Sequence, residues 1–406
     1  MGFFDFFKST PSPERFATIA ANGLRAEGYS APIQVDQPGF RLLLGADGEH
    51  IFNLDNFYRD YCRASRAERK IVMQRYAKSM IGNELPTAFA DAKSKLLPIL
   101  RSRSMIEYVA LTATGDLGVP GLPAYQPFST DTVLMLAYDT EHSMMTLNES
   151  MLADWGVSFA TALAVATDNL RDATVASFEQ VAPGLFIGTW DDAYDTSRLL
   201  FPDMVYQLGV GGEPLVMIPT RSRIIVVSAN DRAAQLTMIG LARQFVEEEG
   251  RQVSALMYRY EQGSAVEYAP SDPEVASLLA EFLRSTLAGD YASQKEMLEK
   301  SHEETGIDIF VASYQVLSSQ RTGLQASFSV WAENVDTLLP ETDLVALVSS
   351  AELEDGRSGP PKLVAWHDLQ AATGAFKRLP DRYPPRYELV NFPDLAAREA
   401  LPETEL

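Results

Sequence analysis

The chain of 406 residues contains a single cysteine, Cys62, and this scarcity limits the kinds of site that it can build. One cysteine cannot form an intramolecular disulfide bond, and it cannot supply the several thiolates of a zinc cage. The sequence therefore fits a reducing compartment, and we expect a cytoplasmic protein. Cys62 lies in a short stretch of helical character, where a lone cysteine usually packs as a small apolar side chain.

Long apolar runs are also missing. No stretch of about eighteen uninterrupted apolar residues occurs, so the sequence predicts no membrane span. The first seven residues include Phe3, Phe4, Phe6 and Phe7, without the basic region and longer apolar core of a secretory signal. Our interpretation is a short helix docked on its own domain, and weak association of this amino-terminal segment with a membrane or a partner is the alternative.

Basic residues are few for a chain of this length. Lys and Arg number 34 against 55 Asp and Glu, which gives a formal net charge of −21. A surface this negative repels phosphate backbones and anionic headgroups, so we expect no nucleic-acid partner. The acidity also favours solubility, and it does not by itself identify a function.

The common catalytic signatures are absent from the sequence. There is neither a GxxxxGK[ST] phosphate loop nor a GxSxG nucleophile elbow, and the glycines of residues 209–212 follow a predicted helix instead of opening one. His302 begins the sequence HEETG, in which a zinc-binding helix would need a second histidine where Gly306 stands. We therefore expect no cofactor and no structural zinc.

The hydrophobic pattern predicts an α+β protein of two domains. In the first domain, residues 1–268, a mixed sheet is combined with helices. Residues 114–127 form a Gly- and Pro-rich loop between strands near 104–112 and 131–139. The remaining predicted strands are 175–181, 185–190, 214–218, 223–229 and 253–260, and helices follow Ser158 and Asn230.

A turn-rich stretch after Tyr268 marks the predicted domain boundary. A helix begins at Pro273 and is expected to end at Gly289. Alternating apolar residues at 310–316 and 326–330 then predict an antiparallel sheet, so residues 269–392 form a second, smaller α+β domain. Residues 393–406 are acidic and poor in apolar residues, which predicts a disordered tail.

Several segments of the first domain resemble a known bacterial family. They are LLPILRSRSMIEYV, LNESMLADWG, FATALAVATDNL, LFIGTWDDAYDTSRLL and PLVMIPTRSRIIVVSAND. In this order they resemble the YtpQ-like family, domain of unknown function fourteen-forty-four, over about residues 10–268. The resemblance rests on the block Tyr194-Asp195-x-Ser197-Arg198. It implies a bacterial protein, and it implies no activity and no catalytic residues.

The densest group of polar residues lies between a predicted strand and a predicted helix. It comprises Trp190, Asp191, Asp192, Tyr194, Asp195 and Arg198. The carboxylates could hold a divalent cation, or one could act as a general base beside Arg198. Alternatively, acidic residues at a helix start cap free N–H groups, and Asp195 forms a local ion pair with Arg198.

Two Arg-Ser-Arg units form a second group of candidates. Arg101 and Arg103 precede a predicted strand, and Arg221 and Arg223 stand at the entry to another. Their guanidinium groups could form a docking point for an anion or a carboxylate, or they could neutralise acidic surroundings. We also expect Arg101 or Arg103 to approach Asp192 or Asp195 across the sheet.

Two classes of function remain open at this point. The missing motifs, the second domain and the apolar amino terminus favour a non-catalytic interaction or scaffold protein with a protein partner. The alternative is a hydrolase or transferase with an Asp/Arg site around residues 191–198, which could depend on a divalent metal.

Overall fold

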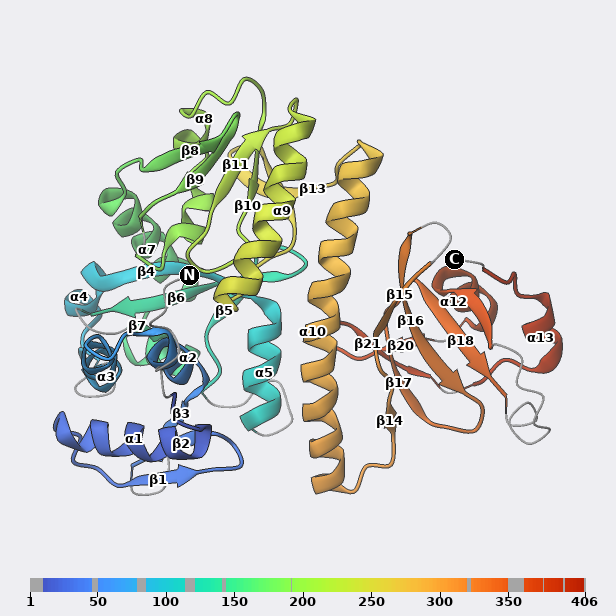
Figure 1. The fold of residues 1–406 in the computed structure, drawn as a ribbon, viewed down its shortest axis with the longest axis horizontal. Helices are drawn as coiled ribbons and strands as arrows, with labels where there is room; N and C mark the ends of the chain where they lie inside the picture. The colour runs from blue at the N-terminus through green and yellow to red at the C-terminus, as the bar shows by residue number, and fades with distance from the viewer. Residues whose placement is uncertain are drawn as a thin grey trace, which may run out of the picture. The chain divides into compact units, whose positions relative to one another are not determined.

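The computed structural model describes residues 10–45, 50–78, 85–113, 121–140, 144–190, 192–319, 323–349, 361–374, 376–389 and 391–404. The amino-terminal phenylalanines, Asp191 and residues 114–120 lie outside this range, so the predictions made for them stay predictions. Helices and strands are mixed along the chain, which confirms the α+β class (Figure 1). No helix in the described ranges combines the length and hydropathy that a bilayer span requires.

The chain divides into two compact units that differ from the predicted domains. The first contains residues 1–96 and 137–146, and the second contains residues 97–136 and 147–406. The predicted boundary near residue 268 lies within the second unit. A separate role for the residues after that boundary therefore stays a prediction.

The first unit packs short helices on a small antiparallel sheet. Its strands are β1 (Ile33–Asp36), β2 (Arg41–Leu44), β3 (His50–Asn53) and β7 (Met144–Thr146), and β1, β2 and β3 form one sheet. Its helices are α1 (Pro13–Ala26), α2 (Asp55–Arg63), α3 (Arg69–Lys78), α4 (Phe89–Ala92) and η2 (Lys93–Lys95). Phe16 of α1 is fully buried, with ring centres of Phe57, Tyr58 and Tyr61 5.0 to 5.1 Å away. This aromatic cluster holds the helices together.

The second unit is built on a six-stranded antiparallel sheet with the order β13-β12-β10-β11-β9-β8. These strands are β8 (Phe178–Ala182), β9 (Leu185–Gly188), β10 (Pro214–Met217), β11 (Ile225–Ser228), β12 (Met257–Glu261) and β13 (Ser264–Tyr268). Helix α9 (Arg232–Glu249) covers one face, where Met238 and Ile239 pack among Leu215, Met217 and Ile225. The opposite face buries Val216 and Val226 against other parts of the unit. Alternate residues of these strands therefore enter two separate cores.

Further elements lie outside this sheet. They are β4 (Leu96–Ser102), α5 (Arg103–Ala113), β5 (Tyr125–Pro127), β6 (Thr132–Asp139), α6 (Glu149–Asp154), α7 (Phe159–Ala173), η3 (Asp195–Leu200) and α8 (Pro202–Tyr206). Strand β6 is shared between the units, because its residues from Ala137 on belong to the first unit. The strand predicted near residues 104–112 was wrong, because this segment is helix α5. Ile106, Glu107, Ala110 and Leu111 are all buried. Their spacing places them on one face of a helix, whereas a strand would bury alternate residues.

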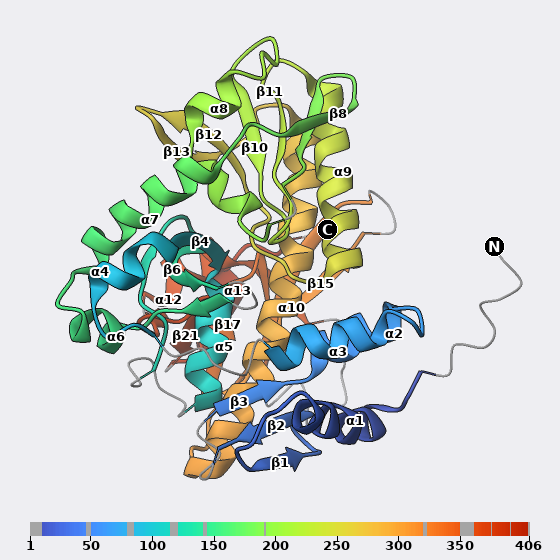
Figure 2. The same ribbon diagram turned by 90° about the vertical axis from the view of Figure 1, so that its left-hand side faces the viewer.

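Helix α10 (Pro273–Thr305) is 33 residues long and does not end at Gly289. A single glycine weakens a helix without ending it when neither proline nor a left-handed residue follows. The helix ends at Gly306, whose φ of 70° is left-handed. Helix α10 packs along α5 and α9 on one side and against the strands that follow it on the other (Figure 1; Figure 2 gives the view from the side of α5).

The strands after α10 form two four-stranded sheets with the orders β14-β17-β21-β20 and β15-β16-β18-β19. These strands are β14 (Phe310–Val311), β15 (Gln315–Ser318), β16 (Gln325–Ala332), β17 (Thr337–Pro340), β18 (Leu344–Val348), β19 (Lys362–Ala365), β20 (Phe376–Arg378) and β21 (Arg386–Leu389), with α12 (Trp366–Thr373) after β19. Each sheet contains one parallel pair, so the prediction of an antiparallel sheet is corrected to mixed sheets. The chain leaves β16, passes through β17 in the other sheet, and returns in β18 parallel to β16.

The predicted disordered tail is ordered over residues 391–404. Helix α13 (Leu395–Ala400) begins at Asp394, whose carboxylate accepts the N–H of Ala397 at 2.8 Å. Leu401 is 5% exposed, and the N–H of Thr404 donates to the carbonyl of Leu363 at 2.9 Å. Lys362 of β19 also donates to the carbonyl of Arg398 at 2.7 Å, and the ring of Phe392 packs on that of Trp331. These contacts attach a segment that is otherwise acidic and polar.

A buried polar network joins the residues of the second unit that come before position 268 to those that come after it. Arg386 is fully buried, and its Nε donates to Gln294 of α10 at 2.6 Å. Its Nη1 donates to the carbonyls of Ala312 and Leu338 at 2.8 and 3.1 Å. Gln294 in turn donates to Glu107 of α5 at 3.3 Å. Because these bonds run between buried groups of separate elements, the network ties α5, α10 and the sheet that contains β21 together.

Candidate functional site

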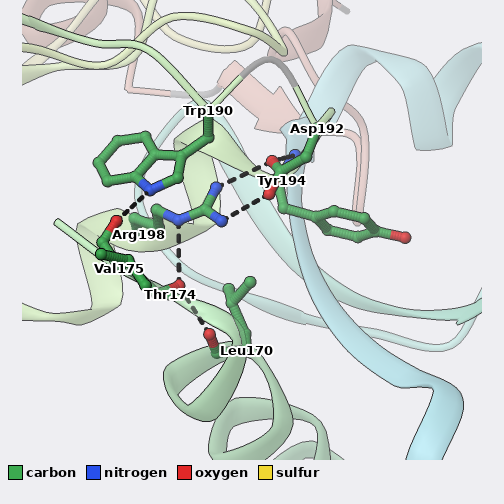
Figure 3. A network of polar contacts seen from close by, with 7 residues as sticks. All are labelled: Leu170, Thr174, Val175, Trp190, Asp192, Tyr194 and Arg198. Carbon is green, nitrogen blue, oxygen red and sulfur yellow. Dashed lines mark hydrogen bonds and ion pairs between the residues drawn. The ribbon is translucent and has the colours of Figure 1, made fainter. Parts of the chain in front are cut away.

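The Asp/Arg group predicted as a catalytic candidate contains a bidentate ion pair between Arg198 and Asp192 (Figure 3). The side chain of Arg198, in η3, is 1% exposed. Its Nη1 and Nη2 donate to the two carboxylate oxygens of Asp192 at 2.9 and 2.5 Å. Its Nε donates to the hydroxyl of Thr174 at 3.1 Å. All three guanidinium nitrogens are therefore occupied within the protein.

The surroundings of Arg198 also hold its guanidinium plane. Its guanidinium carbon lies 4.3 Å from the ring centre of Trp190, which is a cation–π distance. The indole N–H of Trp190 donates to the carbonyl of Val175 at 2.7 Å, and the Thr174 hydroxyl donates to Leu170 at 2.6 Å. These bonds connect the loop after β9, η3 and the end of α7.

Asp192 is the only member of this ion pair that reaches solvent, with 40% of its side chain exposed. Partial burial opposes its ionisation, but hydrogen bonds from Arg198 and from the N–H of Tyr194 outweigh this effect and hold the pKa of Asp192 below its usual value. The carboxylate is therefore charged at neutral pH, and its oxygens accept internal donors.

The predicted local pair between Asp195 and Arg198 is not the one that forms, because Arg198 pairs with Asp192. Asp195 is fully buried at the first position of η3. Within the described ranges, no three His, Cys, Asp or Glu side chains gather in a way that could hold a metal ion. The described part of this group has the features of a structural clamp.

The two Arg-Ser-Arg units contribute one arginine each to a buried basic cluster. Arg101, near the end of β4, is 2% exposed and donates to the carbonyl of Leu100 at 2.8 Å. Burial and the nearby charges of Arg221 and Arg251 lower the pKa of Arg101 to about 9. Burial and Arg251 also lower the pKa of Arg221, to about 10. Arg101 and Arg221 are thus close enough to repel each other.

The other two arginines point elsewhere. Arg103 opens α5, and its guanidinium carbon lies 5.3 Å from the ring centre of Tyr383. Arg223 pairs with Glu249 at 2.7 Å and lies over the ring of Phe245. The four arginines therefore do not form one docking point.

A hydrogen bond places β4 beside the helix that contains Arg198. The N–H of Leu100 donates to the hydroxyl of Ser197 at 3.3 Å, so β4 runs beside η3. A direct approach of Arg101 or Arg103 to Asp192 or Asp195 stays a prediction.

A pocket of about 480 Å³ lies elsewhere in the second unit, and sequence reasoning did not find it. It lies between the turn before β6, the middle of α10, and the strands after α10. Its acidic lining residues are Asp131, Glu267, Glu341 and Asp343, and its tyrosines are Tyr291, Tyr314 and Tyr383. We call this cavity the acidic pocket. Its volume lies within the range of small-ligand sites.

One basic residue, Arg284, belongs to the described lining, and an acidic neighbour neutralises it. Its Nε lies 2.8 Å from Asp343, which also accepts the N–H and hydroxyl of Ser327 at 2.7 and 2.8 Å. These bonds outweigh the effect of partial burial and lower the pKa of Asp343. The remaining acidic residues give the pocket a negative charge.

The base of the acidic pocket contains a buried carboxyl group. Asp131 is 4% exposed and accepts the hydroxyl of Ser254 and the N–H of Ala255 at 2.9 and 3.0 Å. Burial raises the pKa of Asp131 to about 6 despite these bonds. Burial raises the pKa of Asp290 of α10 to about 6 as well, and the charge of Asp131 adds to this shift.

Aromatic rings form the walls of the pocket. Tyr291 and Tyr314 stack with their centres 4.9 Å apart and their planes at 17°. Tyr383 is 4% exposed, and its hydroxyl has no hydrogen-bond partner among the residues that the structure describes. Charge, a bonded buried carboxyl group and an unbonded hydroxyl therefore meet in one cavity.

The pocket was missed because its residues are scattered over more than 250 positions of the chain. Asp131 follows a turn, Glu267 lies in an exposed edge strand, and Tyr383 lies in a loop. None belongs to a motif with a fixed spacing. Only the tertiary packing of α10 brings them together.

Comparisons with protein-family models, curated proteins and solved structures find no match to this chain. The resemblance of residues 10–268 to the YtpQ-like family therefore stays a prediction.

Proposed function

We propose that this protein is a non-catalytic interaction protein and that the acidic pocket takes part in recognising its protein partner. The observation that carries the proposal is the contrast between two sites. The guanidinium of Arg198 has all three nitrogens bonded internally, whereas the acidic pocket is open and offers charged and aromatic groups to a ligand. Concave sites with a few convergent polar groups are typical binding sites.

The internal bonds of the Asp192–Arg198 pair favour binding over catalysis. An arginine that stabilises a developing charge needs donors that face the reacting atoms. A general base must take up a proton near neutral pH. Asp192 instead accepts donors from Arg198 and Tyr194, which hold its pKa below the usual value. The described part of this group therefore favours the interaction function over the hydrolase or transferase alternative.

Two further statements belong to this proposal. Residues 10–268 belong to the YtpQ-like bacterial family, supported by the order of five sequence segments. The protein works in the cytoplasm, supported by its single cysteine.

The proposal is tested by a quantitative pull-down from native lysate, with an unrelated acidic protein as the control bait. We expect one protein to be retained by this chain and not by the control, and to bind again when both are purified. The proposal fails if nothing is retained above the control. It also fails if Mg²⁺ or Mn²⁺ changes the fluorescence of Trp190 in the wild type but not in Asp192→Ala.

A further inference from the structure

We propose that the acidic pocket binds an organic cation, an ammonium group on an aliphatic stem, and that the partner supplies it as a lysine side chain. The cation-binding part stands on the pocket alone, and the lysine source rests on the proposed function above. The argument uses charge, an unbonded buried hydroxyl and the shape of the cavity.

The charge of the residues that line the pocket favours a positively charged ligand. Four carboxyl groups and one guanidinium, that of Arg284, line the cavity. With all of them ionised, the lining carries a net charge of −3. Arg284 is already paired with Asp343. The chain as a whole carries a net charge of −21, which attracts cations to its surface. An anionic ligand would meet repulsion both at a distance and within the pocket.

Tyr383 supplies an unbonded polar group on the wall of the pocket. A polar group that faces a cavity and makes no internal bond is available to a ligand. The Tyr383 hydroxyl has no bond to any described residue, although its side chain lines the pocket and is 96% buried. Burial and the charges of Asp131 and Asp290 raise the pKa of Tyr383, so the group stays a neutral phenol. Its oxygen can accept a hydrogen bond from an ammonium group.

The walls of the pocket suit an aliphatic stem. Leu256, Leu283 and Leu287 line the cavity together with the stacked pair Tyr291 and Tyr314. A lysine stem packs on such surfaces while its charged end seeks carboxylates. The acceptors come from separate elements around the cavity, which suits a compact ammonium charge better than a flat guanidinium fork.

The test is a calorimetric titration of the full chain with two amine probes, cadaverine and the peptide acetyl-Gly-Lys-Gly-amide. Acetyl-Gly-norleucine-Gly-amide serves as the uncharged control. We expect both amines to bind and the norleucine peptide not to bind. Tyr383→Phe and Glu341→Gln should each weaken amine binding at least fivefold. Tyr383→Phe removes an unbonded hydroxyl, so its unfolding midpoint should not fall.

A matched variant separates local contacts from total charge. Glu179 lies on the exposed strand β8 and does not line the pocket. Glu179→Gln removes one negative charge from the chain, as Glu341→Gln does, and should leave amine affinity unchanged. Failure of both amines to bind, or equal weakening by the two glutamine variants, overturns the proposal. Tighter binding of cadaverine than of the lysine peptide overturns the assignment of the source to a partner protein.

The two experiments distinguish a failure of the cation site from a failure of the proposed interaction function. If a partner is retained equally by wild type and Tyr383→Phe while no amine binds, the interaction function stands and the cation site fails. If amines bind but no partner is retained, the cation site stands and the interaction function fails.

Discussion

At the scale of single residues, Arg198 shows that the same sequence pattern fits either a catalytic or a structural arginine. Its partner Asp192 lies six positions earlier, and Thr174 and Trp190 complete its surroundings from other segments. The sequence indicated the right group of residues, because the group is dense. It did not indicate the pairing, because the turn at residues 192–194 directs Asp192 toward Arg198 in place of Asp195.

We predict that Arg198→Ala lowers the free energy of unfolding by about 3 kcal/mol. The Arg198 side chain is buried, so its removal leaves a cavity and takes away the hydrogen bonds that it donates to Asp192 and Thr174. The matched control is Arg171→Ala, because Arg171 pairs with Asp203 and both side chains are about half exposed. An exposed pair contributes about 1 kcal/mol or less. Urea denaturation of both variants measures the difference, and equal losses would contradict the structural role.

We predict that Asp290 makes the free energy of unfolding depend on pH. Its pKa rises from 3.8 to about 6 on folding, mainly through burial. The folded state therefore binds more protons than the unfolded state between pH 4 and 6, and this residue makes stability fall as pH rises through that window. Asp290→Asn lacks this effect. From pH 4 to pH 7, the free energy of unfolding of the variant should therefore rise relative to that of the wild type by on the order of 2 kcal/mol.

Denaturant titrations at pH 4 and pH 7 check this value. A constant difference between the two proteins at both pH values would show that Asp290 has an ordinary pKa. The Asn side chain can still accept the hydrogen bond from Ser104, so the comparison tests the charge and not the loss of that contact.

At the scale of elements, α10 positions the acidic pocket, and two of its glycines differ in a testable way. Gly289 lies inside the helix, and Gly306 ends it with a φ of 70°. An added Cβ would meet nothing within 4 Å at either position, so only the backbone conformation separates them. Gly289→Ala should raise the free energy of unfolding by about 0.5–1 kcal/mol, because alanine is the better helix former. Gly306→Ala should lower it by about 1 kcal/mol, because alanine is strained in the left-handed region.

Thermal or urea unfolding of the two variants checks this prediction. A loss of stability in Gly289→Ala would indicate that the helix is interrupted at that position, as we expected from the sequence.

Elements with strong local signals were predicted well from the sequence. The starts of α9 and α10 were predicted near Asn230 or Asp231 and near Pro273. In the structure the carboxylates of Asp231 and Asp272 accept N–H groups of the first turn. The hairpin β10–β11 follows from its apolar runs. Helix α5 was not predicted, because its β-branched and aromatic residues resemble a strand until the buried face is known. The parallel pairs after α10 depend on contacts between distant segments, which no local pattern records.

At the scale of the whole molecule, the residues before and after position 268 belong to one compact unit. The buried network of Glu107, Gln294 and Arg386 crosses that position. We therefore predict that the sheets on its two sides unfold together. Hydrogen exchange followed by mass spectrometry should show β10 and β11 losing protection at the same urea concentration as β16 and β18. Earlier loss in β16 and β18 would support two independent domains with a boundary near residue 268.

The central claim is that the acidic pocket binds a lysine side chain of a partner. The most direct measurement is an NMR titration of the chain, labelled with ¹³C on its tyrosine rings, with acetyl-Gly-Lys-Gly-amide. The signals of Tyr383 are assigned by their disappearance in Tyr383→Phe. The account predicts that the Tyr383 signals shift saturably, and that those of Tyr29, which packs in the core of the first unit, do not. An unchanged Tyr383 signal at saturating peptide, or equal shifts with the norleucine peptide, would contradict it.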